Sequence, residues 1–198
     1  FFEENVRQTP YEAEPDAVPY YGAIGNNRFR GFVQDCARLL KQVDGLQIVG
    51  CNQTGYDTHG AENVNFPNLG RDLATALTAL YHDLKPIWEN TVIMTLTEFG
   101  RTPFTQSGAN TVGKGRDHNM YGFSIWLAGA GLKGGIAHGS TDDIGWKAVE
   151  KPVHWHDYHA TVLHLLGIDH QRFTSPYQGL DQRLTGVEEP RVVTELLA

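Results

Sequence analysis

Between residues 46 and 97 a short apolar run, a helical pattern and a β-branched run follow one another along the chain. The apolar run 46–51 reads as a buried strand, and 69–84 places leucines at spacings of three and four, with Asn68 as its cap and Pro86 beyond its end. The segment 91–97 (TVIMTLT) is typical of a strand covered on both faces. Strand, helix and strand in this order imply a right-handed crossover, so we expect an α/β fold with a mostly parallel sheet flanked by helices.

Further elements are expected on both sides of this unit. The sequence predicts a helix from Phe29 to Val43, capped by Asn26 or Asn27 and ended by Gly45, and another strand over 123–128. A glycine-rich turn region is expected over 129–139, a helix over 157–166 with Asp157 as its N-cap and Gly167 as its stop, and a short helix within 190–198. Residues 1–25, which hold three prolines, read as an extended lead-in to one domain over 26–198.

Composition excludes several classes of protein. The formal net charge of the 198-residue chain is −7 and its basic residues are scattered, which argues against a nucleic-acid partner. No run reaches the roughly 20 apolar residues that span a bilayer, so no membrane span is expected. The two cysteines, Cys36 and Cys51, could form a disulfide in an oxidising compartment or remain two small buried thiols.

Polar side chains gather after the predicted strands, where the loops of a parallel sheet meet at one edge. The candidate metal ligands are Asp57, His59, Glu98, Asp117 and His118. Because this set mixes carboxylates with imidazoles, it suits Zn²⁺ or Mn²⁺ better than Ca²⁺, and two such ions could share it. Taken one by one, these residues could equally be turn formers and solvated side chains; their convergence favours a divalent metal site.

Two arginines and a histidine-rich stretch lie close to these ligands in the sequence. Arg101 and Arg116 could bind an anionic substrate through bidentate contacts, or could pair with the neighbouring acids. In the stretch 154–159, helix capping and packing explain most of the histidines, and His156 is the one kept open as a site residue.

Several consecutive stretches resemble one family: GYDTHG at 55–60, TEFGRTP at 97–103, GRDHN at 115–119, LAGAGLKGG at 127–135 and HDYHATVLHLLGIDH at 156–170. They are similar to the bacterial family called domain of unknown function 1501, which is related to the sulfatases and the alkaline phosphatase superfamily. The resemblance runs from about residue 28 to the C-terminus. It implies an alkaline-phosphatase-like α/β sandwich, of which this chain is the C-terminal part, with one or two metal ions at an ester hydrolase site.

The same resemblance gives expectations for individual residues. Asp57 and His59 match the family's Asp-Thr-His stretch, and His118 is placed like the last metal histidine of the superfamily. Sulfatase-like enzymes end a strand in Asp-His-Gly where this chain has Glu98-Phe99-Gly100, so a carboxylate is kept and an imidazole is lost. The helix from Asp157 resembles a structural helix of the superfamily. The nucleophile and a further metal aspartate are expected in an N-terminal half of the same protein, which is therefore the expected partner.

Two functional hypotheses follow. In the first, the protein is a metal-dependent hydrolase of phosphate or sulfate esters, acting on an anionic small molecule or a glycan ester. In the second, it is a non-catalytic structural or binding subunit of an extracytoplasmic assembly, with a degenerate metal site; the loss of the imidazole at Phe99 favours this hypothesis. Family members commonly carry an export signal, which implies the periplasm or cell envelope. A protease is disfavoured because neither a His-Glu-x-x-His nor a Gly-x-Ser-x-Gly motif is present.

Overall fold

The computed structural model describes residues 10–15, 19–20, 28–106 and 114–198, and the chain divides into two compact units. Unit 1 comprises Phe1–Trp88 and Phe104–Asp117, and unit 2 comprises Glu89–Pro103 and His118–Ala198. Of the lead-in expected over 1–25, only 10–15 and 19–20 are described, and they form no helix or strand. The proposed caps Asn26 and Asn27 lie outside the described residues.

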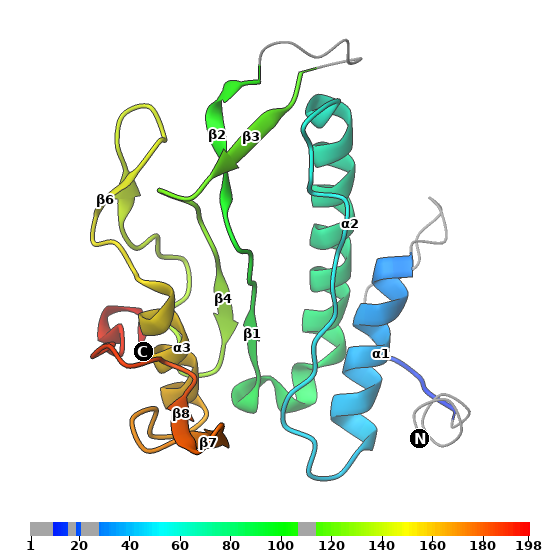
Figure 1. Ribbon diagram of the computed structural model, residues 1–198. Coiled ribbons are helices and arrows are strands. Elements are labelled where there is room, and N and C mark those ends of the chain that lie inside the picture. Colours follow the sequence, from blue (N-terminus) through cyan, green and yellow to red (C-terminus); the bar gives the residue numbers. More distant parts are fainter. Residues whose placement is uncertain (1–9, 16–18, 21–27, 107–113) are drawn as a thin grey trace. The chain divides into compact units, whose positions relative to one another are not determined.

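Unit 1 is built on two helices that lie side by side, α1 (Arg28–Gln42) and α2 (Glu62–Asp83) (Figure 1). The buried hydrophobic core of the unit comes from the two helices, from Tyr20 of the lead-in and from Leu84 just after α2: Tyr20, Val33, Ala37, Ala76, Ala79, Leu80 and Leu84. Small alanines on both helices let the backbones approach closely, and the leucines fill the remaining space. After α1 the chain turns at Gly45, whose φ of 77° suits glycine, so the prediction for this helix is confirmed.

Helix α2 begins earlier than predicted. It starts at Glu62, after Ala61 in a left-handed conformation, and continues through Pro67, so Asn68 lies inside the helix and is not its cap. Proline removes one hydrogen bond near the start of the helix, a cost that the remaining turns of this 22-residue helix tolerate. A short 3₁₀ helix, η2 (Lys85–Asn90), follows directly.

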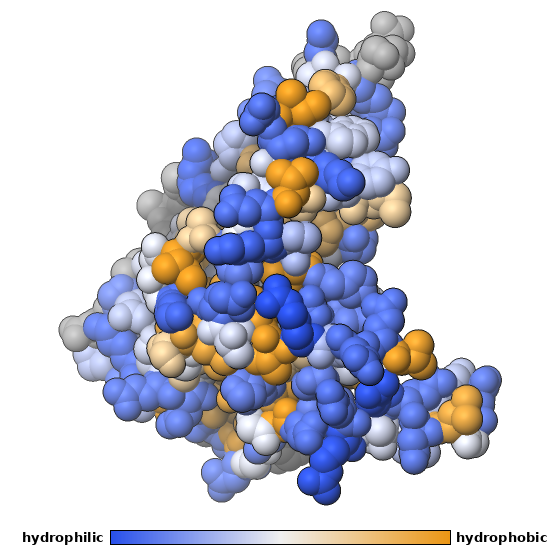
Figure 2. Space-filling view, turned by 90° about the vertical axis from the view of Figure 1, so that its left-hand side faces the viewer, coloured by the Kyte–Doolittle hydropathy of each residue, from blue (hydrophilic) through white to orange (hydrophobic). Residues whose placement is uncertain are grey.

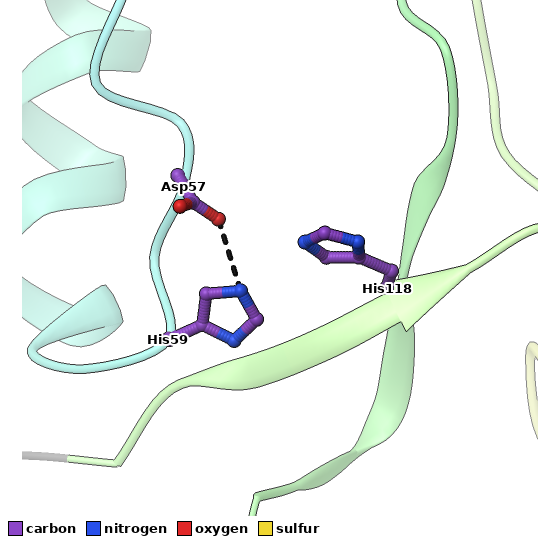
Figure 3. Close-up of side chains that lie close together, drawn as sticks. All are labelled: Asp57, His59 and His118. Atoms are coloured by element: carbon purple, nitrogen blue, oxygen red, sulfur yellow. Dashed lines mark ion pairs between the residues drawn. The ribbon is translucent and has the colours of Figure 1, made fainter.

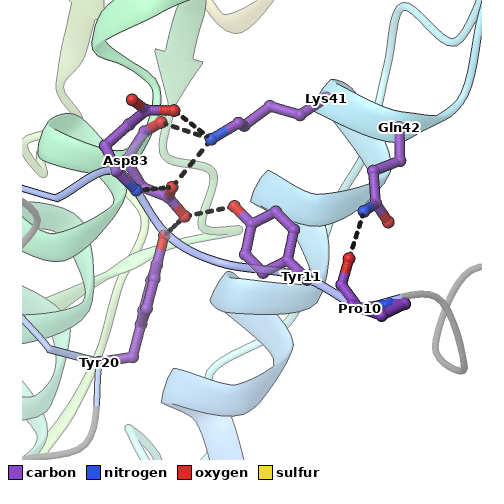
Figure 4. A network of polar contacts seen from close by, with 7 residues as sticks. Pro10, Tyr11, Tyr20, Lys41, Gln42 and Asp83 are labelled. Carbon is purple, nitrogen blue, oxygen red and sulfur yellow. Dashed lines mark hydrogen bonds and ion pairs between the residues drawn. The ribbon is translucent and has the colours of Figure 1, made fainter.

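The described part of the lead-in docks on these helices around the fully buried Asp83 (Figure 4). One carboxylate oxygen of Asp83 accepts hydrogen bonds from the hydroxyls of Tyr11 and Tyr20, at 2.5 and 3.0 Å. The other accepts from the backbone N–H of Glu14 at 3.2 Å and from Nζ of Lys41 at 3.2 Å. A buried carboxylate therefore ties the segment before α1 to the end of α2.

The two cysteines lie next to each other in unit 1, where both are free thiols. A hydrogen bond between the thiols, donated by Cys36, lowers the pKa of Cys51 to about 7, although partial burial opposes this shift. The same hydrogen bond, together with burial, raises the pKa of Cys36. Cys51 is exposed, so it is the accessible member of the pair.

Unit 2 combines short antiparallel strand pairs with one helix. Strand β1 (Val92–Met94) pairs with β4 (Leu127–Gly129), β5 (Ser140–Thr141) with β6 (Ala148–Glu150), and β7 (Thr174–Tyr177) with β8 (Leu180–Arg183). Strands β2 (Gly100–Thr105) and β3 (Arg116–Asn119) form a further pair. Positive φ angles at Gly129, Gly131, Gly135 and Gly139 agree with the predicted turn region.

The helix of unit 2, α3 (Trp155–Leu165), is held at its start by the C-terminal tail. Its N-cap is His154, whereas the predicted cap Asp157 is the third residue of a capping box: its carboxylate accepts from the backbone N–H of His154 and of Arg191, at 3.3 and 2.9 Å. The buried Thr161 hydroxyl accepts from the backbone N–H of Val193 at 2.9 Å. Gly167 follows the helix with a φ of 72°, and the tail ends in the short 3₁₀ helix η3 (Thr194–Leu196).

The prediction of a mostly parallel, alkaline-phosphatase-like sheet is wrong for the described residues. Residues 46–51 form no strand, so the crossover from which parallel pairing was inferred does not exist. The expected strands over 91–97 and 123–128 shrink to β1 and β4, whose register is antiparallel, with Ile93 opposite Ala128. In the sequence, strands β2 and β3 lie between β1 and β4. Because antiparallel neighbours need no helical crossover, no helix is required between them.

Large hydrophobic side chains remain on the surface of unit 2. Leu96, Phe123 and Trp126, near the β1–β4 pair, are 61%, 42% and 37% exposed. Figure 2 shows such hydrophobic side chains scattered among hydrophilic ones on one face. Among the described residues, no helix combines the length and apolar character needed to cross a bilayer, which agrees with the expectation of no membrane span.

Candidate functional site

The loop before α2 carries Asp57 and His59, and it packs along the first half of that helix. Nε2 of Gln53 donates to the backbone carbonyl of Leu69 at 3.0 Å, and the hydroxyl of Tyr56 donates to Oε1 of Gln53 at 2.8 Å. The Tyr56 ring meets the ring of Phe66 edge-on, with centroids 6.2 Å apart. These contacts fix the loop on both sides of the Gly55 turn, so Asp57 and His59 are presented from an anchored segment.

The same loop lies against the segment that leads into β3. Gly60 and Lys114 form an antiparallel bridge, and the backbone N–H of Arg116 donates to the carbonyl of Thr58 at 3.2 Å. A Cβ atom at Gly115 would lie 2.1 Å from that carbonyl oxygen, so the close approach of the two segments requires glycine there. The glycine of the GRDHN stretch thus positions Asp117 beside the Asp57 loop.

His59 is the centre of the resulting cluster. Its Nε2 lies 3.0 Å from a carboxylate oxygen of Asp57, the ion pair drawn in Figure 3. Its Nδ1 lies 3.0 Å from Oε1 of Gln106 and 3.9 Å from a carboxylate oxygen of Asp117. The imidazole is 39% exposed and the Asp57 carboxylate 75%, so a solvent-borne ion can reach both.

Both ring nitrogens of His59 therefore face oxygen acceptors. A neutral imidazole has a single N–H, and here Gln106 is the near acceptor for a proton on Nδ1. With the proton on Nδ1, the lone pair of Nε2 would point at the Asp57 carboxylate, which is repulsive unless a cation lies between them; with the proton on Nε2, that N–H donates to Asp57. Sequence reasoning missed Gln106, because an amide in the polar stretch TQSGAN carries no signature of this role.

Asp117 lies on the other side of the His59 ring from Asp57. It faces Nδ1 of His59, whereas Asp57 faces Nε2, so Asp57 and Asp117 cannot bind one ion together with the same imidazole nitrogen. A carboxylate on the far side of a metal-binding imidazole orients the ring and raises its basicity. Asp117 fits this supporting role, next to Gln106.

The remaining predicted site residues belong to unit 2. His118, also drawn in Figure 3, is the first residue of the second segment of that unit, and its ring stacks on Phe99 with centroids 3.9 Å apart and planes 21° apart. The guanidinium of Arg101 lies 5.7 Å from the centroid of the Phe99 ring. The carboxylate of Glu98 is exposed. In unit 2 the aromatic ring of Phe99 thus lies against two of the predicted site residues.

A groove of about 430 Å³ opens beside the Asp57 loop in unit 1. It is lined by Glu62, Asn63, Phe66, Pro67, Thr105, Lys114 and Arg116. Nε of Arg116 lies 3.6 Å from a carboxylate oxygen of Glu62, so the acidic pairing considered for this arginine is present. The guanidinium is still 43% exposed, and with Lys114 it gives the groove two basic side chains against one acid.

Searches of curated proteins and of solved structures gave no significant match. A family model described as "Protein of unknown function (DUF1501)" matches residues 8–197. This range includes the Asp57 loop, Gln106, the GRDHN stretch and α3. Since the match covers nearly the whole chain, the protein belongs to the DUF1501 family.

Proposed function

We propose that the chain binds a divalent cation, zinc or manganese, between Asp57 and His59, and that it contributes this ion to a hydrolase of phosphate or sulfate esters. The observation that carries the proposal is the 3.0 Å separation of Nε2 of His59 from the Asp57 carboxylate, with Nδ1 turned to Gln106. Two ligands about 2.1 Å from an ion lie about 3.0 Å apart at a right angle and about 3.4 Å apart in a tetrahedron. The pair therefore fits a six-coordinate ion as it stands and a four-coordinate ion after a small movement.

Different residues of the chain have different proposed roles at this site. Asp57 and His59 would supply two ligands, and Gln106 and Asp117 would hold the proton on Nδ1, which leaves the lone pair of Nε2 for the metal. His118 follows Asp117 in the sequence and is our candidate for a further ligand. A divalent ion held in this way polarises an ester oxygen and stabilises developing negative charge.

Arg116 and Lys114 are the groups that we propose bind the anionic part of the substrate. Both line the groove beside the Asp57 loop, and a guanidinium can form two parallel hydrogen bonds to a phosphate or sulfate. Glu62 holds Arg116 in place in the absence of substrate. Arg101 stacks with Phe99 in unit 2, so we give it no part in substrate binding.

We further propose that an N-terminal half of the same protein supplies the nucleophile and covers exposed apolar side chains of unit 2. Leu96, Phe123 and Trp126 are large hydrophobic residues whose burial would be favourable. A relationship to the sulfatases, an ester substrate of small-molecule or glycan type and an extracytoplasmic location belong to this proposal.

A second function is favoured by one observation. Where sulfatase-like enzymes carry a metal-binding imidazole, this chain has Phe99, and the phenyl ring is stacked on His118. A phenyl ring cannot bind a metal ion, so the protein could keep one ion in a structural or binding role within an envelope assembly. In that case the metal is bound but no ester is turned over.

The test is an assay of the full-length protein with p-nitrophenyl phosphate and p-nitrophenyl sulfate, in the presence of Zn²⁺ or Mn²⁺ and after chelation. We expect turnover that chelation abolishes and that Asp57→Asn and His59→Gln each remove together with the metal. Asp44→Asn, at an exposed position of the same unit, is the matched control and should change neither. Gln106→Leu should weaken metal binding about 10- to 100-fold, because it removes the group that fixes the ring.

The outcomes separate the two functions and can contradict both. Metal binding at Asp57 and His59 without turnover supports the non-catalytic function. Metal that stays bound at full stoichiometry in the Asp57→Asn, His59→Gln double variant would show that the ion lies elsewhere. Turnover that survives chelation would exclude the proposed mechanism.

A further inference from the structure

A second group of metal-ligating side chains lies at the start of α3, entirely within unit 2. It consists of His154, His156 and Glu188, each of which offers a ligand atom within 4.8 Å of the others. His154 and His156 flank the first residue of the helix, and Glu188 comes from the turn after β8. The group shares no residue with the Asp57 and His59 site.

The imidazole of His156 is held in a fixed orientation and lacks a hydrogen bond. Its Nδ1 is buried and has no hydrogen-bond partner within the described part of the chain. The ring stacks on Trp155, with planes 23° apart. It also lies close to Gly186, where an added Cβ atom would be 2.8 Å from Cε1 of His156. Burying a ring nitrogen without a hydrogen-bond partner costs free energy, and a bound ligand would remove this cost.

A carboxylate oxygen of Glu188 lies near that nitrogen, at a distance that suits a shared ion and is too long for a hydrogen bond. Nδ1 of His156 lies 3.6 Å from Oε2 of Glu188, and Nδ1 of His154 lies 3.9 Å from the same oxygen. Hydrogen bonds between nitrogen and oxygen are about 2.7 to 3.2 Å long. Ligands about 2.0 to 2.2 Å from a tetrahedral Zn²⁺ lie roughly 3.3 to 3.6 Å from one another, so small side-chain movements would complete the site.

We propose that His154, His156 and Glu188 form a zinc site that ties the segment 186–191 to the start of α3. Two imidazoles and one carboxylate are a zinc ligand set, and water can take the fourth position. The side chain of Glu188 is 66% exposed and that of His154 is 55% exposed, so an ion can enter from solvent.

Two features of the helix start bear on this site. The positive end of the α3 dipole disfavours a cation, and the carboxylates of Glu188 and Asp157 offset it. Nδ1 of His154 also accepts a 3.3 Å hydrogen bond from the backbone N–H of His156, so metal binding there displaces this weak cap bond. The carboxylate of Asp157 still accepts from the backbone N–H of His154, and the metal would join the helix start to Glu188.

The experiment isolates this site by placing Asp57→Asn and His59→Gln in the full-length protein and titrating Zn²⁺ by calorimetry. We expect one bound zinc ion, and a zinc-dependent rise in the melting temperature. Adding Glu188→Gln should weaken binding at least tenfold, whereas Glu189→Gln, an exposed neighbour, should not change it. Adding His154→Asn keeps a good N-cap while removing the imidazole, and it should weaken binding to a similar extent.

Two results would overturn the proposal: no zinc bound in the Asp57→Asn, His59→Gln background, or equal zinc affinity with Glu188→Gln and Glu189→Gln. Far-ultraviolet circular dichroism of each variant confirms that α3 is still folded. Because the two sites share no residue, loss of this one leaves binding at Asp57 and His59 in the unmodified protein untouched.

Discussion

Replacing Asp83 with alanine is the perturbation whose effect on unit 1 can be worked out most fully. The carboxylate is fully buried and accepts hydrogen bonds from Tyr11, Tyr20, the backbone of Glu14, and Lys41. Alanine leaves two phenol hydroxyls and a backbone N–H without their acceptor and removes one partner of a partly buried ion pair. It also removes the carboxylate that joins the lead-in to the end of α2, while the contacts that Lys41 and Gln42 of α1 make with Glu14 and Pro10 remain.

The size of the loss follows from these bonds. A hydrogen bond to a charged group contributes about 1.5 to 3 kcal/mol, and breaking a buried ion pair costs about 3 to 5 kcal/mol. Lys41 keeps Glu14 as a partner at 2.7 Å, and the four hydrogen bonds share one carboxylate, so the contributions do not add. We expect Asp83→Ala to lower the free energy of unfolding by about 3 to 5 kcal/mol.

The assay is urea unfolding followed by far-ultraviolet circular dichroism, which reports mainly on the helices. Asp44→Ala, at an exposed position, is the control and should change the free energy of unfolding by less than about 0.5 kcal/mol. Tyr20→Phe keeps the shape of the ring and should cost about 1 to 2 kcal/mol. A loss below about 1 kcal/mol for Asp83→Ala would refute the reasoning, because removing a buried carboxylate that accepts from four donors should cost more free energy than this.

Three further predictions concern other parts of the chain. Burial, and then Asp83, raise the pKa of Tyr20, so the unfolded chain releases that proton from about pH 10 while the folded chain keeps it; stability should fall as the pH rises above 10, and Tyr20→Phe should reduce this slope in alkaline urea titrations. Alkylation of Cys51 by iodoacetamide should rise with pH around a midpoint near 7, and Cys36→Ala should slow it about tenfold or more at pH 7; equal rates would show that Cys36 does not stabilise the thiolate. Thr161→Val should lower stability by about 1 to 3 kcal/mol in thermal unfolding, because it leaves the backbone N–H of Val193 without an acceptor, and an unchanged melting temperature would contradict this.

The helices could be predicted from the sequence because their signals are local. Apolar residues at spacings of three and four locate α1, most of α2 and α3, and Gly45 and Gly167 mark chain reversals after two of them. The starts were harder to predict. The sequence predicts Asn68 as the cap of the second helix, whereas that helix begins at Glu62. The residue that caps α3 is His154, an imidazole, whereas Asp157 three residues later has the commoner capping side chain.

The sheet could not be predicted, because the pairing of strands depends on segments far apart in the sequence. The apolar run 46–51 has the composition of a buried strand but no partner strand among the described residues, and Ile48 is 71% exposed. Without that strand there is no crossover, and β1 pairs antiparallel with β4. Direction and register are settled by such partners and not by the composition of one strand.

The candidate site was predictable only in part for a similar reason. Asp57 and His59 are two residues apart, so their proximity follows from local spacing. The sequence does not reveal which nitrogen of His59 each neighbour faces. Asp117 faces Nδ1, where we propose a supporting role for it, and Gln106 lies in the cluster although no sequence motif marks it.

The most direct test of the metal site is a crystallographic measurement of anomalous scattering at the zinc and manganese absorption edges on the full-length protein. We predict an anomalous peak within bonding distance of both Nε2 of His59 and the carboxylate of Asp57. Crystals grown with either metal that show no peak there, while His59 and Asp57 remain paired directly, would contradict the account.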